Sequence, residues 1–138
     1  MYDLNRFLTA QSRDYAAALR EIQNGRKRSH WIWYIFPQVA GLGMSSTSQY
    51  YAISGLDEAR AYLRESTLRA HLLEISSALL ALDESDPTAV FGFPDDLKLR
   101  SSMTLFAAAA PDEPVFAAVL EKFFGGQPDA RTLQILGL

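Results

Sequence analysis

Leucine and isoleucine recur at helical spacing between residues 68 and 82 of this 138-residue chain. The apolar positions are separated by four, three, four and three residues and are Leu68, Leu72, Ile75, Leu79 and Leu82. On a helix with about 3.6 residues per turn, this spacing aligns the five side chains in one stripe that can pack against a core. The segment predicts the clearest amphipathic helix of the chain, and similar spacing elsewhere predicts a chain that is helical nearly throughout.

Start and stop signals divide the rest of the chain into short helices. The first begins at Leu4 and ends before Gly25, because glycine readily takes the left-handed conformation that closes a helix. Ser12 is a candidate cap for a second segment inside it, and Ser54 with Asp57 matches a capping box. Further helices are expected at 45–53, 54–63, 87–91, 94–109, 114–124 and 129–136. We predict a mainly α fold, a compact single domain over residues 1–138 with about eight short helices.

The most apolar segment runs from Trp31 to Phe36 and contains one tryptophan at its start and the other at Trp33. Its aromatic and β-branched residues suit a short strand, whereas Ser29 could cap a short buried helix, and periodicity does not distinguish the two in so short a run. Pro37 ends the segment in either case. Each aromatic side chain can bury roughly 150–250 Å². We therefore expect the segment to lie centrally, with at most a small β-element near residues 31–36.

Composition excludes several classes of protein. The chain has 13 basic and 16 acidic side chains and a net charge of −3, whereas a general nucleic-acid-binding domain is normally basic, so we expect no nucleic-acid partner. The absence of cysteine excludes disulfides and thiolate metal sites. The two histidines, His30 and His71, are too few for a histidine-rich metal site. We predict no metal and no cofactor.

The N-terminal residues lack the basic and apolar regions of a signal peptide. The longest apolar run is also far shorter than the ~18 residues that a membrane span needs. We therefore expect a cytoplasmic protein without a membrane partner. The sequence gives no indication of an oligomeric state.

Three groups of polar residues are candidates for function. The first contains Lys27, Arg28 and His30 and immediately precedes the aromatic run in the sequence. Cations beside a candidate helix start indicate an anion site, although a solvated basic loop would have the same sequence. Trp31 or Trp33 would stack on a ring of the ligand. His30 would be the acid–base residue, because a half-buried imidazole can titrate near pH 7.

The second group, between residues 45 and 51, is dense in hydroxyl and amide groups. Its candidate ligand contacts are Ser46, Ser48, Gln49 and Tyr50. The glycines of the preceding loop would let the backbone approach a ligand closely. A helix cap with exposed serines is the alternative interpretation.

The third group is Lys98, Ser101 and Ser102, on the helix expected at 94–109. Lys98 would neutralise the charge of a ligand. Serine side chains compete for backbone hydrogen bonds in a helix interior, so either a buried polar site or a close contact between helices must compensate. His71 lies among leucines at helical spacing and is interpreted as a structural or surface residue.

Over essentially its whole length, the chain resembles a bacterial family of unknown function, domain-of-unknown-function family 1810. The matching stretches include Asp3–Phe7, Gly25–Gln38, Gly41–Gly43, Asp57–Leu63 and Asp95–Phe106. The resemblance implies membership of this family, but the family has no established activity that it could imply for this chain.

The order of elements also resembles the NADAR family, which is linked to ADP-ribose and NAD-derived substrates. In that family a glutamate lies between a serine and a tyrosine, and the corresponding residue here is Gln49, between Ser48 and Tyr50. This resemblance implies that Gln49 binds sugar or amide groups. A glutamine cannot act as a base, which puts glycosidic cleavage in doubt.

These observations predict one polar pocket with walls at residues 26–38, 45–51 and 98–104. It would bind or process a small anionic ligand such as a nucleotide or an ADP-ribose-like compound, and the question of enzymatic activity is left open. The alternative is a non-enzymatic protein-interaction module that presents an exposed aromatic patch. RNA binding by the basic run and a tryptophan is a third hypothesis, and the acidic composition disfavours it.

Overall fold

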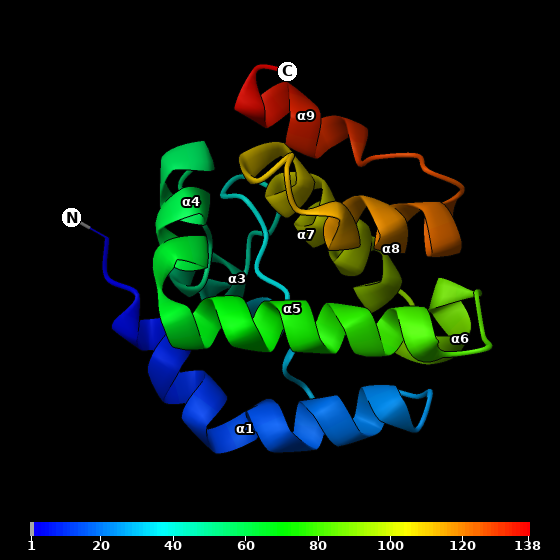
Figure 1. The fold of residues 1–138 in the computed structure, drawn as a ribbon. Coiled ribbons are helices and arrows are strands. Elements are labelled where there is room, and N and C mark those ends of the chain that lie inside the picture. Colours follow the sequence, from blue (N-terminus) through cyan, green and yellow to red (C-terminus); the bar gives the residue numbers. More distant parts are fainter. Residues whose placement is uncertain (1) are drawn as a thin grey trace.

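The structure is a computed structural model that describes residues 2–138 (Figure 1). Within this range the chain forms nine helices and no extended strand, which confirms the mainly α fold. The helices are α1 (Asn5–Gln23), α2 (Ile32–Ile35), α3 (Ser46–Tyr50), α4 (Leu56–Arg64), α5 (Ser66–Ala81), α6 (Pro87–Phe91), α7 (Asp95–Ala109), α8 (Pro114–Phe124) and α9 (Ala130–Leu136).

Helix α5 crosses the middle of the molecule, with α1 along one side and α4 and α8 on the other (Figure 1). Its predicted apolar stripe is confirmed, because the four stripe residues from Leu68 to Leu79 are buried. Leu82 lies just beyond the last residue of the helix. Helix α7 is the most central element and contacts α2, α4, α6, α8 and α9. The first turn of α7 therefore meets the segment that carries the tryptophans.

The segment from Trp31 to Phe36 forms the short helix α2, so of the two predicted alternatives the strand is wrong. Trp31, Ile35 and Phe36 are buried in the core, as expected for so apolar a run. The isolated β-bridge described in residues 2–138 lies just after this segment and pairs Val39 with Ile53 in parallel. This bridge closes the base of a loop that carries α3.

Side-chain caps begin three of the short helices. Ser45, Asp86 and Asp129 each accept a hydrogen bond from a backbone N–H in the first turn of α3, α6 and α9. Ser12 caps nothing, because α1 continues through it and its hydroxyl donates to the carbonyl of Thr9. Local hydrogen bonding to the preceding turn explains how a serine is accommodated inside that helix.

The predicted capping box at the start of α4 is wrong. Gly55 is the N-cap of this helix, and no side chain caps it. Instead, the carboxylate of Glu58 accepts a hydrogen bond of 2.7 Å from the backbone N–H of Ser54. The glutamate lies one residue later than the aspartate of the predicted box, so the sequence pattern identified the wrong acid.

Two explanations were predicted for the serines inside α7, a buried polar site or a close contact between helices. The structure favours the close contact. Ser101 and Thr104 donate to the carbonyls four residues before them, at 3.1 and 2.8 Å. Ser102 is fully buried, and its hydroxyl has no hydrogen-bond partner within the described chain. Small side chains let neighbouring helices approach α7 closely, and two of the three hydroxyls are satisfied inside the helix itself.

Candidate functional site

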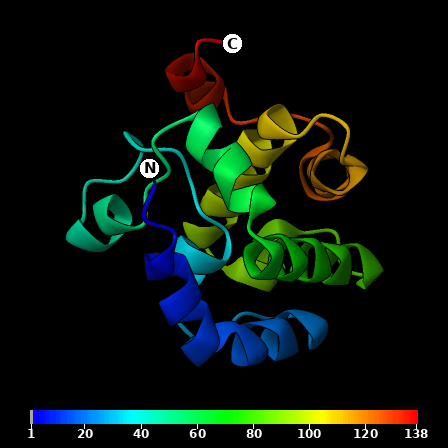
Figure 2. The ribbon, with the colours of Figure 1, turned by 60° about the vertical axis from the view of Figure 1, so that its left-hand side comes forward.

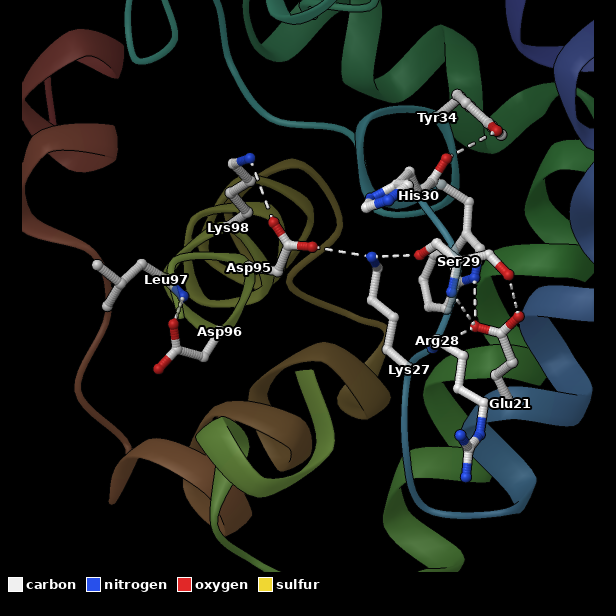
Figure 3. A network of polar contacts seen from close by, with 11 residues as sticks. Glu21, Lys27, Arg28, Ser29, His30, Tyr34, Asp95, Asp96, Leu97 and Lys98 are labelled. Carbon is white, nitrogen blue, oxygen red and sulfur yellow. Dashed lines mark hydrogen bonds and ion pairs between the residues drawn. The ribbon is translucent and has the colours of Figure 1, made fainter. Parts of the chain in front are cut away.

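The first turn of α7 brings two lysines onto one carboxylate (Figure 3). Lys27 Nζ lies 2.9 Å from Asp95 Oδ2, and Lys98 Nζ lies 3.2 Å from Asp95 Oδ1. The neighbouring Asp96 points to another side of the helix and accepts a hydrogen bond from the hydroxyl of Thr88. Because one carboxylate balances only one ammonium group, the trio of Lys27, Asp95 and Lys98 carries one excess positive charge.

The two lysines of this trio differ in their access to solvent. The Lys27 side chain is only 5% exposed, its ammonium group donates to the carbonyl of Ser29, and it lies 5.0 Å from the ring centre of Trp31. The Lys98 side chain is 25% exposed, and its ammonium group lies 5.3 Å from the ring centre of Trp33. The accessible part of the excess charge is therefore at Lys98, beside Trp33.

An internal carboxylate occupies the place where the sequence predicted an external anion (Figure 3). Glu21 of α1 accepts hydrogen bonds from the backbone N–H groups of Arg28 and Ser29, at 2.6 and 2.9 Å, and from the Ser29 hydroxyl at 2.6 Å. The indole N–H of Trp31 donates to the same carboxylate at 3.0 Å. Burial raises the pKa of Glu21, but these hydrogen bonds to the charged form outweigh burial and lower the pKa to about 2.

A hollow of about 100 Å³ lies between Trp33 and the loop that carries α3. Ten residues line it: the polar Gln38, Ser48 and Gln49, the aromatic Trp33 and Tyr51, and the small or apolar Val39, Ala40, Gly41, Gly43 and Ala52. A Cβ atom at Gly43 would lie 2.5 Å from the Cβ of Ser48. The loop therefore approaches α3 so closely that only glycine fits at this position.

A second, wider hollow lies on the other face of α3. Trp33 and Tyr51 line this groove as well, and its other lining residues are Arg13, Tyr34, Ser46, Thr47 and Tyr50. The groove is open and has a volume of about 510 Å³. None of the five residues of α3 is buried, and Figure 2 shows α3 standing away from the packed helices. Helix α3 is thus a projecting element with a hollow on each side.

The base of the α3 loop is firmly anchored. The backbone N–H of Ala40 donates to the carbonyl of Ile53, and the N–H of Ile53 donates to that of Gln38, both at 2.8 Å. The guanidinium group of Arg6 donates to the carbonyls of Tyr50 and Ala52, at 2.9 and 3.0 Å. Residues 39–53 therefore form an Ω-loop, a surface loop whose two ends lie close together.

Arg6 is in turn held by an acidic partner. Its guanidinium group forms an ion pair of 3.0 Å with Glu58, and both side chains are almost fully buried. Nothing in the local sequence around Arg6 indicates this role, because its partners lie 44 to 52 residues away. Sequence reasoning likewise missed Glu21 and Arg13, whereas Gln38 was included only as the end of the predicted wall at residues 26–38.

The structure brings together six of the predicted site residues. Trp33 lines both hollows, Lys98 lies against its ring, and the opposite walls carry Ser46, Ser48, Gln49 and Tyr50. The predicted convergence of three separate segments is therefore present around Trp33.

The other predicted site residues lie away from these hollows. Trp31 is 1% exposed and part of the core, and Lys27 is enclosed by its ion pair. Ser101 and Ser102 are buried within α7. Arg28 and His30 are exposed on the loop before α2, and the backbone carbonyl of His30 accepts a hydrogen bond from Tyr34.

Two further findings bear on the class of site. Among residues 2–138, no three histidine or acidic side chains are grouped so that they could hold a metal ion. No helix in the described part of the chain combines the length and the apolar character that a bilayer-crossing helix requires.

The fold defines a small all-α protein, with two hollows beside Trp33. The chain matches the family described as "Protein of unknown function (DUF1810)" over residues 1–136, and it belongs to that family. Among solved structures, it is similar to the conserved hypothetical protein Rv1873 from Mycobacterium tuberculosis, with 44% sequence identity and a TM-score of 0.97. The similarity covers 99% of this chain and 98% of that protein. No curated protein matches the chain.

Proposed function

We propose that this protein binds a small anionic ligand, such as a nucleotide or an ADP-ribose-like compound, beside Trp33. One observation carries the proposal: a polar hollow lies between Trp33 and the residues Ser48 and Gln49, while Lys98 lies against the same indole ring. An aromatic wall with a few convergent polar groups is the usual composition of a small-molecule site.

The charge at this site supports an anionic ligand. Lys27 and Lys98 share Asp95, and Lys27 is enclosed, so Lys98 supplies the accessible excess charge. A partly exposed ammonium group keeps much of its hydration, so it attracts an anion without holding it alone. Stacking on Trp33 would supply the remaining affinity.

The size of the hollows limits how such a ligand would lie. Ligand pockets usually measure roughly 300–1,000 Å³, whereas the smaller of the two hollows measures only about 100 Å³. Only one part of a nucleotide would enter it, and the remainder would lie over the open groove, near Tyr50 and Arg13. His30, the predicted acid–base residue, lines neither hollow, so the proposal is limited to binding.

A thermal-shift measurement with AMP, ADP-ribose and NAD tests the proposal. A ligand present at 100 times its Kd adds about 2.7 kcal/mol to the free energy of unfolding, which raises Tm by several degrees. Lys98→Met should reduce this shift, and Arg26→Met is the matched control because it removes an exposed positive charge at a residue that lines neither hollow. No shift with any of the three compounds, in protein shown to be folded by circular dichroism, would contradict the proposal.

A second candidate function is a protein-interaction module, and the exposed side chains of the α3 loop favour it. Met44 is 83% exposed and Tyr50 is 60% exposed, both on the projecting part of the loop. Met44→Ser separates the two functions, since Met44 lines neither hollow. The substitution should leave a ligand-induced Tm shift intact and should weaken binding of a protein partner.

A further inference from the structure

We infer that the smaller hollow beside Trp33 receives an uncharged planar group that carries a hydrogen-bond donor next to an acceptor, such as a carboxamide. The negative charge of the ligand would then lie outside the hollow, at Lys98. The inference rests on the proposed function and specifies which part of the ligand each portion of the site recognises.

The lining of the hollow carries no formal charge. None of the ten residues that line it within the described chain is Asp, Glu, Lys, Arg or His. Lys98 lies against Trp33 but does not line the hollow, and Arg13 lines only the open groove. A carboxylate or phosphate placed inside would lose hydration without gaining an opposite charge, whereas an uncharged polar group loses much less.

The hydrogen-bonding groups of the lining match a carboxamide. Gln38 makes no side-chain hydrogen bond within residues 2–138, so its own amide offers both donors and acceptor. Gln49 uses one N–H to bind the carbonyl of Met44 and keeps its oxygen and its second N–H. Each of these two amide side chains can pair with a ligand group that has a donor next to an acceptor. A carboxylate has no donor, because both of its oxygens only accept.

The lining of the hollow includes an aromatic side chain on which a flat group can stack. The indole of Trp33 forms one wall, and the loop backbone at Gly41 and Gly43 contributes lining without side chains. Gly41 has a φ angle of +102°, a conformation that glycine adopts far more readily than other residues. A planar amide or a ring that bears one can stack on the indole in the usual offset arrangement.

A pair of probes that differ in one functional group tests the inference. Benzamide and benzoate share the same ring, but benzamide carries an uncharged amide and benzoate a carboxylate. In NMR titrations, benzamide should shift the side-chain amide signals of Gln38 and Gln49 and the backbone signals of Gly41 and Gly43. Benzoate should bind there at least tenfold more weakly. Equal or tighter binding of benzoate at these signals, or no perturbation by benzamide, would overturn the inference.

Two variants test the role of Gln49. Gln49→Leu should weaken benzamide binding several-fold, whereas Arg26→Met, at an exposed residue that lines neither hollow, should leave it unchanged. Because α3 contributes no buried side chain, Gln49→Leu is expected to fold. If a nucleotide raises Tm in a way that depends on Lys98, but benzamide binds no more tightly than benzoate, this inference is contradicted and the proposed function is not. If benzamide binds but AMP, ADP-ribose and NAD cause no shift in Tm, the proposed function is contradicted and the preference of the hollow for an uncharged amide is not.

Discussion

At the scale of single residues, the carboxylate of Glu21 occupies the site that the sequence predicted for an external anion. Its carboxylate accepts four hydrogen bonds from the loop before α2, and this loop was predicted to bind an external anion. The groups that bind the carboxylate are two backbone N–H groups, the Ser29 hydroxyl and the Trp31 indole N–H, and not the predicted cations. Their partner was not found, because Glu21 lies seven to ten positions earlier and no spacing rule links a helix end to a loop at that distance.

The lowered pKa of Glu21 leads to a pH-dependent prediction. A carboxyl group whose folded-state pKa lies below its ordinary value stabilises the fold above that ordinary value, here 4.5, and loses this effect as the pH falls toward about 2. Glu21→Gln should lower the free energy of unfolding by about 1–2 kcal/mol at pH 7. Urea unfolding at pH 7 and pH 2.5 measures this difference, which should shrink strongly at the lower pH. A difference that is the same at both values would contradict the role of the charged form.

Gln11 determines the protonation of His71 in a second polar cluster. Its amide nitrogen donates to the carbonyl of Tyr34 and to the hydroxyl of Tyr62, at 2.8 and 2.9 Å. Its oxygen therefore faces His71 Nδ1, at 2.8 Å, so this nitrogen carries a proton. Burial lowers the pKa of His71, and its ring stacks on Tyr15 with the ring centres 3.7 Å apart. The interpretation of His71 as a structural residue agrees with this arrangement, which joins α1 to α5.

At the scale of elements, the α3 loop is held at its base and free along its length. Helix α3 buries no side chain, while Arg6 holds the carbonyls of Tyr50 and Ala52. Segments with few buried contacts open locally at a lower free-energy cost than the core. We infer that the position of Ser48 and Gln49 relative to Trp33 depends on the base of the loop.

The ion pair between Arg6 and Glu58 gives a testable prediction for this element. Arg6→Met leaves the buried carboxylate of Glu58 without its partner, which should cost about 3–5 kcal/mol of stability. Hydrogen exchange should also accelerate at the amides of Ala40 and Ile53 relative to those of α7. Chemical denaturation and exchange measured by mass spectrometry report the two effects.

The double variant Arg6→Met/Glu58→Leu is the control for this prediction. It removes both charges, so its loss of stability should be smaller than the sum of the two single losses. Strictly additive losses would indicate that the ion pair does not couple the two residues. Unchanged exchange in the loop of the single variant would show that Arg6 does not hold the loop.

At the scale of the whole molecule, the core is organised around α7. Phe106 is fully buried, and its ring centre lies 5.3 Å from that of Tyr62 on α4 and 5.8 Å from that of Phe116 on α8. One side chain thus connects three helices that are distant in sequence. We expect the packing of these helices to be lost together when this contact is removed.

Phe106→Ala should therefore destabilise the entire fold by about 3–5 kcal/mol, the usual cost of replacing a buried phenylalanine. Tyr50→Ala is the control, because Tyr50 is mostly exposed and its loss should cost less than about 1 kcal/mol. Thermal unfolding followed by circular dichroism compares the two variants. Similar values of Tm for the two would contradict a core centred on α7.

The helices could be predicted because their signals are local. Apolar spacing identified α5, and local start and stop signals identified helices near 45–53, 87–91 and 129–136, since a cap and its amide lie within three residues. The same local rules failed at Ser12, whose hydroxyl donates to the carbonyl of Thr9, and at Ser54, whose backbone N–H donates to the carboxylate of Glu58. The choice between strand and helix at 31–36 depended on packing, which local pattern does not contain.

The sequence by itself determined a helical chain with a central aromatic segment and identified Trp33, Lys98 and the serine-rich turn as candidates for one site. Only the tertiary structure decided which lysine is accessible, because the partner of Lys27 comes from α7, and it decided that the backbone of the basic loop binds Glu21 of α1. It also decided that Gln38 and Gln49 share a hollow. The physical reason is range: hydrophobic periodicity and capping act over a few residues, whereas ion pairs and burial depend on contacts between residues far apart in the chain.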